Sequence, residues 1–178
     1  MNNMRTAVPG LFSILCYRRR MKELREKTLV ECPVGEAETG LVTFFAARQG
    51  ADGVTRIRLR VPMDGSSLSF EREVRVEARE GRDDDNLNDV VRIAWEPEAP
   101  VIFPRFEGTL VAWGEDDPGK SFIELRGHYT PPLGAAGQIF DEAIGFEIAQ
   151  STAREFLRDI KRDVEARARF KKKVSNGG

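Results

Sequence analysis

The longest periodic pattern in the chain runs over residues 137–170, where apolar residues recur every three or four positions. The positions of this stripe are Ile139/Phe140, Ala143, Phe146, Ala149, Ala153, Phe156/Leu157, Ile160 and Val164. Charged residues fill the other faces, so the spacing predicts one amphipathic helix with a single buried stripe. At about 1.5 Å per residue this helix is roughly 45 Å long, and it needs a partner surface of similar length.

Between residues 54 and 130 the period of the pattern is two, which is typical of half-buried antiparallel strands. Residues 54–63 show it best, with Ile57, Leu59, Val61 and Met63 on one face and three arginines on the other. The same reasoning predicts strands over 68–79, 89–96, 102–114 and 122–130, of which 102–114 forms one strand or two joined at Pro104 or Gly108.

Two elements precede these strands. A weak alternation over 28–34 predicts a short first strand, and 36–49 has helical spacing with acidic residues in its first turn. The order is therefore strand, helix, a run of five or six strands, and one long helix. This order predicts an α+β fold in which helices cover one face of an antiparallel sheet.

The length of 178 residues suits one domain, which we place at 27–170 between an extension, 1–26, and a basic tail, 171–178. The net charge is −1 with 32% charged residues, which argues against a nucleic-acid binder that relies on a basic surface. The two cysteines, Cys16 and Cys32, are far apart in the sequence. A disulfide framework or a zinc site is therefore not expected, and a reducing cytoplasm is the predicted location.

The extension contains an apolar run, Val8–Tyr17, followed by the basic cluster Arg18–Arg20. The run is about half as long as the roughly 20 residues of a membrane-spanning helix. A signal peptide places its basic residues before the apolar run rather than after it. Two interpretations remain open: a loosely ordered extension, and a peripheral contact with a membrane.

Three segments give the chain a family resemblance. They are FPRFEGTL (Phe103–Leu110), LRGHYTPPLG (Leu125–Gly134) and GQIFDEAIGFEIA (Gly137–Ala149). In these segments the chain resembles an uncharacterised bacterial branch of the START-like, or SRPBCC, superfamily, related to polyketide cyclase/dehydrase and lipid-transport proteins. The resemblance covers residues 27–168, and only one helix stands where the superfamily has a pair after the first strand.

The resemblance implies a helix-grip fold, in which a curved antiparallel sheet of about six to seven strands wraps around the long C-terminal helix. It also implies a small hydrophobic ligand between sheet and helix, and no cofactor. The candidate lining residues are those expected on the facing surfaces of sheet and helix. They are Phe70, Arg72, Phe106, Gly127, Tyr129, Phe140, Ile144 and Gly145.

The two glycines among these candidates, Gly127 and Gly145, remove side-chain volume where sheet and helix meet. A glycine inside a helix costs about 1 kcal/mol relative to alanine. It therefore indicates either close packing of the two elements or space kept for a ligand, and the sequence leaves both interpretations open.

Two polar candidates have alternatives of their own. Arg72 shares its strand parity with inward-facing apolar residues, and a buried guanidinium needs an anionic partner. That partner is an acidic helix residue such as Asp141 or Glu142, or a ligand anion, unless a bulge or an edge position exposes Arg72. Tyr129 either donates a hydrogen bond to a ligand or covers the core with its hydroxyl in water.

No residue pattern points to catalysis. The single histidine, His128, lies on the polar face of its strand, and neither a catalytic triad, a phosphate loop nor a metal-ligand cluster can be found. Trp95 and Trp113 fit as ordinary strand residues. The aromatic residues expected inside are Phe103, Phe106, Phe140, Phe146 and Phe156.

The leading hypothesis is a protein that binds or carries a small hydrophobic molecule. One alternative is an enzyme of the polyketide cyclase/dehydrase type, with Arg72 or Tyr129 polarising the substrate. Another is an interaction module with a filled core. The sequence identifies neither the ligand nor the oligomeric state.

Overall fold

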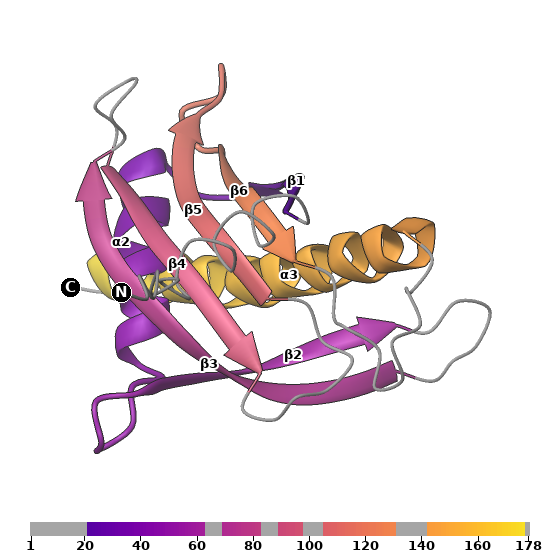
Figure 1. The fold of residues 1–178 in the computed structure, drawn as a ribbon. Helices are drawn as coiled ribbons and strands as arrows, with labels where there is room; N and C mark the ends of the chain where they lie inside the picture. Colours follow the sequence, from indigo (N-terminus) through magenta and orange to yellow (C-terminus); the bar gives the residue numbers. More distant parts are fainter. Residues whose placement is uncertain (1–20, 63–68, 83–88, 98–104, 131–141, 177–178) are drawn as a thin grey trace, which may run out of the picture.

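A computed structural model of the chain describes residues 21–62, 69–82, 89–97, 105–130 and 142–176 (Figure 1). Its elements are β1 (Lys22–Val30), α2 (Val34–Ala46), β2 (Thr55–Pro62), β3 (Ser69–Arg82), β4 (Asp89–Pro97), β5 (Arg105–Gly114), β6 (Ser121–Thr130) and α3 (Glu142–Asn176). The expected order of elements is therefore present, and the segment predicted as one strand or two contributes the single strand β5.

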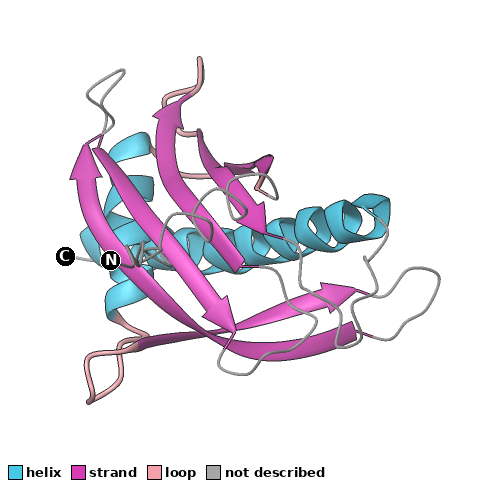
Figure 2. Cartoon of the chain, in the orientation of Figure 1, coloured by secondary structure: helices cyan, strands magenta, loops and turns pink. Residues whose placement is uncertain are grey.

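The strands form one six-stranded antiparallel sheet in the order β1-β6-β5-β4-β3-β2. The sheet is curved, and both helices lie on the same face of it, which we call the inner face (Figures 1 and 2). Helix α3 contacts both edge strands, β1 and β2. The sheet therefore wraps around the helix, and the predicted α+β architecture with a long gripped C-terminal helix is confirmed.

The core lies between the inner face and the helices. The strand residues of the core cluster share one parity in each strand, and α3 contributes the apolar stripe predicted from the sequence, from Ala149 through Val164. The largest fully buried side chains are Leu24, Val30, Phe44, Leu59, Leu110, Ile123, Leu125, Tyr129, Phe156, Leu157 and Ile160. Burial of this contiguous apolar set is the main favourable contribution to the fold.

Specific contacts hold α3 in the sheet. The Lys161 ammonium donates a hydrogen bond of 2.7 Å to the carbonyl oxygen of Leu29 in β1. Helix α2 approaches α3 at Gly40, where an added Cβ would lie 2.8 Å from Cγ2 of Val164. The glycine therefore permits the close crossing of the two helices.

The first strand begins at Lys22 and not at residue 28, so residues 22–26 are part of the sheet and not of the expected extension. The alternation was hidden because both faces of this edge strand carry charge. Leu24 is buried, but the next inner position is Glu26, whose carboxylate accepts from Arg154 of α3 at 3.2 Å. Similarly, α3 continues to Asn176, so most of the expected basic tail is helical.

Candidate functional site

An aromatic cluster fills the middle of the space between sheet and helix. Trp95 and Phe106 are partners in the β4–β5 register, and their rings stack with centroids 4.4 Å apart and planes 20° apart. Phe156 of α3 meets Trp95 edge-on at 5.6 Å, and Phe44 of α2 lies 6.1 Å from Phe156. The cluster ties both helices to the centre of the sheet through offset and edge-to-face contacts.

A pair of glycines lies beneath this cluster. Gly108 and Gly127 are register partners in β5 and β6. A Cβ on Gly127 would lie 2.3 Å from the Glu107 carbonyl oxygen, and a Cβ on Gly108 would lie 2.2 Å from the Arg126 carbonyl oxygen. The Cζ atom of Phe106 lies 2.9 Å and 2.8 Å from these two Cβ positions. Close strand approach and the Phe106 ring therefore occupy the space at Gly127, which favours close packing over a cavity there.

The inner face ends in a second aromatic contact. Tyr129 is fully buried, its hydroxyl included, so the expectation that this hydroxyl reaches water is wrong. Its ring centroid lies 6.2 Å from that of Phe146 in α3. Phe146 is 38% exposed, whereas we expected it inside. Apolar surface that is continuous with the core therefore reaches solvent at this end, which we call the open end.

The structure brings three of the predicted lining residues together: Phe106, Gly127 and Tyr129. Phe70 and Arg72 lie in β3 opposite Val61 and Leu59, but their side chains lie outside the described part of the chain. The other predicted residues are Phe140, which lies outside the described residues, and Ile144 and Gly145, which belong to α3 with their side chains outside the description.

The proposed partners of Arg72, Asp141 and Glu142, lie outside the described side chains as well, as does Phe103.

Sequence reasoning missed the part played by Trp95 and Phe44. Trp95 shares its parity with Ile93 and Val91, so its inward direction was available from the alternation of β4. Its stacking on Phe106 depends on the register of two strands, which no local pattern shows.

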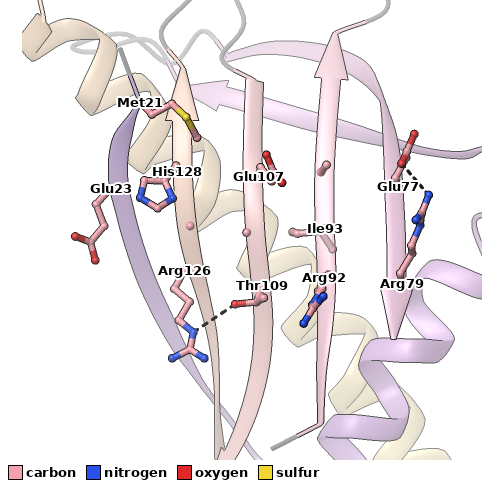
Figure 3. Close-up of a pocket in the computed structure, with 13 residues that line it drawn as sticks. Met21, Glu23, Glu77, Arg79, Arg92, Ile93, Glu107, Thr109, Arg126 and His128 are labelled. Atoms are coloured by element: carbon pink, nitrogen blue, oxygen red, sulfur yellow. Dashed lines mark hydrogen bonds and ion pairs between the residues drawn. The ribbon is translucent and has the colours of Figure 1, made fainter. Parts of the chain in front are cut away.

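A groove of about 700 Å³ lies on the opposite face of the sheet, which we call the outer face (Figure 3). It crosses β1, β6, β5, β4 and β3, and Gly108 and Gly127 contribute bare backbone to its lining. The Arg126 guanidinium donates to the Thr109 hydroxyl at 3.3 Å inside it. His128 is exposed in this groove, in agreement with its predicted solvent-facing position.

Other candidate chemistry is limited. Within the described ranges, no group of three or more His, Cys, Asp or Glu side chains is placed to hold a metal ion. Cys32 is buried, and burial raises the pKa of its thiol, so it is not an activated nucleophile. None of the described helices combines the length and apolarity that crossing a membrane requires.

No family model matches the chain, and no curated protein matches it. Several solved structures do match the chain in fold. The Zhui aromatase/cyclase from Streptomyces sp. R1128 is 16% identical with a TM-score of 0.50, over 83% of this chain and 95% of that one. The di-domain ARO/CYC StfQ from the steffimycin biosynthetic pathway is 12% identical with a TM-score of 0.52, over 87% of this chain and 54% of that one.

TTHA0849 from Thermus thermophilus is 21% identical with a TM-score of 0.47, over 83% and 99% of the two chains. At such identities a likeness shows the fold alone, and the fold is the one that the sequence resemblance implied.

Proposed function

We propose that this protein, which has the helix-grip fold of the START-like (SRPBCC) superfamily, binds or carries a small hydrophobic molecule at the open end. The observation that carries the proposal is the position of Phe146, 38% exposed beside the fully buried Tyr129. A ligand that covered this ring would remove apolar surface from water while resting on the edge of the core. Full burial of a phenylalanine side chain contributes about 1.5–3 kcal/mol.

The described lining indicates the kind of ligand. Phe146 presents an exposed ring in contact with the buried ring of Tyr129, and such an aromatic surface suits a planar or ring-containing molecule. The buried Tyr129 hydroxyl supplies one polar atom within this apolar setting. Since the Trp95–Phe106–Phe156 cluster fills the middle of the interior, the ligand belongs at the open end and not under the centre of the sheet.

The first experiment is native mass spectrometry of the purified protein, followed by solvent extraction and identification of any bound molecule. A fluorescent apolar probe then measures affinity in the wild type, in Phe146→Asp and in a matched control, Phe170→Asp. Phe170 lies on the same helix and is 70% exposed, but it lies far along α3 from the open end. We expect roughly ten- to 100-fold weaker probe binding in Phe146→Asp, corresponding to about 1.5–3 kcal/mol, and unchanged binding in the control.

Equal probe affinity in Phe146→Asp and the wild type would refute a ligand site at the open end. Equal losses in both aspartate variants would point to non-specific adsorption on α3. A bare protein that takes up no probe would favour the alternative of an interaction module with a filled core. Gly145→Leu provides an independent check, because its added volume at the start of α3 should reduce uptake in a folded variant.

A second candidate function is catalysis of the polyketide cyclase/dehydrase type. It is supported by the two solved structures with TM-scores of 0.50 and 0.52, both described as aromatase/cyclases. In this case Tyr129, with Arg72 as a second candidate, polarises a bound substrate. Chemical conversion of the extracted molecule by wild type, with binding but no conversion in Tyr129→Phe, would favour the enzyme. Binding without conversion in both would favour the carrier.

A further inference from the structure

The last turns of α3 carry an exposed apolar pair. Phe170 is 70% exposed and Val174 is 61% exposed. The two residues are four positions apart, so their side chains lie one above the other on the same face of the helix. Every residue from Arg169 to Ser175 is exposed, so neither side chain of the pair is part of the core. We call Phe170 and Val174 the tip pair.

A dense basic cluster surrounds the tip pair. Residues 166–176 contain five basic residues and no acidic one, whereas the whole chain has a net charge of −1. At about 100° per residue, Lys171 and Lys173 flank Phe170 on its two sides. The long stem of a lysine can lie along apolar surface while its ammonium reaches outward. The five basic residues are Arg167, Arg169, Lys171, Lys172 and Lys173.

Nearby carboxylates neutralise only part of this cluster. Three of the five basic residues have a carboxylate within 4 Å, and they are exposed, so these pairs contribute little and exchange readily with other anions. Lys172 and Lys173 have no acidic partner among the described side chains. The cluster therefore keeps an excess of positive charge. The three pairs are Arg167–Asp163 at 2.6 Å, Arg169–Glu165 at 3.8 Å and Lys171–Glu36 at 3.4 Å.

The fold places this end of α3 where a large partner can reach it. Helix α2 crosses α3 where Gly40 meets Val164, and α3 continues from there to Asn176, over about 18 Å. Figure 1 shows this C-terminal end (yellow) at the opposite end of α3 from Glu142 (orange). A groove of about 500 Å³ between the two helices reaches Phe170, so this ring is not packed against α2.

The size and the charge of this surface select the kind of partner. A stable protein–protein interface buries about 800 Å² on each side, whereas a phenylalanine supplies about 150–250 Å² and a valine less. A second copy of the chain would bring its own basic cluster against the first, and the two would repel each other. An anionic membrane needs no matching shape. Basic amphipathic helices bind such membranes through lysine and arginine at the headgroups and apolar side chains at the acyl boundary.

We propose that the end of α3, residues 166–176, docks on membranes that contain anionic lipids. Phe170 and Val174 enter the boundary between headgroups and acyl chains, and the surrounding lysines and arginines contact the lipid phosphates. Phe146, at the open end, lies about 36 Å away from Phe170 along α3. The proposal therefore concerns a different surface from the ligand site and does not depend on the proposed function.

The test measures sedimentation of the full chain with vesicles of phosphatidylcholine, alone or mixed with phosphatidylglycerol. We expect binding to the mixed vesicles only, and weaker binding as salt is added. Each lysine or arginine near an anionic surface contributes about fivefold in affinity, so the double variant Lys172→Gln/Lys173→Gln should bind about 25-fold more weakly. The matched control, Arg58→Gln/Arg79→Gln, removes the same charge from two exposed arginines of the sheet and should bind as wild type does.

A second variant tests the apolar part of the contact. Phe170→Ala keeps every charge and should bind the mixed vesicles about tenfold more weakly, because its ring no longer leaves water. Since Phe170 is largely exposed, the urea midpoint of this variant should match that of wild type. The binding loss then cannot come from unfolding.

Four results would overturn the proposal. The first is a wild type that does not sediment with the mixed vesicles, and the second is equal sedimentation with phosphatidylcholine alone. The third is wild-type affinity in either the lysine double variant or Phe170→Ala, which would place the membrane contact elsewhere in the chain. The fourth is a wild type that binds a DNA duplex and no vesicles, which would make the basic cluster a nucleic-acid contact.

Discussion

The packing of Phe106 gives the sharpest test of the interior. Its ring is 3% exposed, stacks on Trp95 and covers the glycine pair. Replacement of a buried phenylalanine by alanine costs about 3–5 kcal/mol, and the cost rises with the volume that stays empty. Neither Gly108 nor Gly127 has a side chain that can move into the space. We therefore expect Phe106→Ala to lower the free energy of unfolding by about 4–5 kcal/mol.

Urea denaturation measures this loss. With a slope near 2 kcal/mol per molar for a domain of this size, the midpoint should fall by about 2 M while the slope stays constant. The matched control is Phe170→Ala, since that ring is 70% exposed and its removal should change stability by no more than about 0.5 kcal/mol.

The void should also accept a ligand, because apolar cavities in proteins stay dry and take up small aromatic molecules. Benzene should therefore raise the unfolding temperature of Phe106→Ala more than that of wild type, by mass action. A loss below about 3 kcal/mol, the low end for such truncations, would refute the packing argument. It would mean that the ring is not held between Trp95 and the glycine pair, or that the strands close over the space.

Three further predictions concern single sites. Gly127→Ala should lower the urea midpoint, because the added Cβ would lie 2.3 Å from a backbone oxygen. Gly35→Ala, where the added Cβ meets open space, should instead raise the free energy of unfolding by about 0.5 kcal/mol. Equal effects of the two replacements would contradict the close approach of β5 and β6. The hydrogen bond from Arg56 lowers the pKa of Asp52 to about 2. The contribution of this pair to stability is therefore present above about pH 4 and disappears as the pH falls toward 2. NMR titration of Arg56→Gln should show a higher pKa for Asp52, and an unchanged pKa would exclude Arg56 as the cause. Iodoacetamide at neutral pH should modify Cys32 only after unfolding, since this thiol is buried and burial raises its pKa. Peptide mass spectrometry localises the label, and rapid labelling of Cys32 in the native protein would contradict its burial.

Much of the fold was predictable because its strongest signals are periodic. The stripe of α3 and the alternation of β2 each repeat over enough residues to fix both the element and its buried face. β1 lacked this signal, because Glu26 occupies an inner position and relies on Arg154 of α3 for its partner. An inward-facing carboxylate whose partner lies more than 100 positions further along the sequence cannot be recognised from the pattern of the strand alone.

The site was predictable to a smaller extent for a related reason. Parity placed Phe106, Gly127 and Tyr129 on the inner face. It did not show that the ring of Phe106 lies over Gly127, because that contact depends on the β5–β6 register. The burial of the Tyr129 hydroxyl depends likewise on how α3 crosses the end of the sheet.

The strand order has a consequence for synthesis on the ribosome. Strands β2 to β5 pair with neighbours in sequence and can form a meander as they emerge, but β1 must wait for β6. The ion pair between Arg25 and Glu124 joins residues 99 positions apart. Helix α3, which covers the apolar inner face, is translated after every strand. A nascent sheet with an unpaired first strand and an uncovered hydrophobic face is a substrate for chaperones, and such long-range closure makes folding slow.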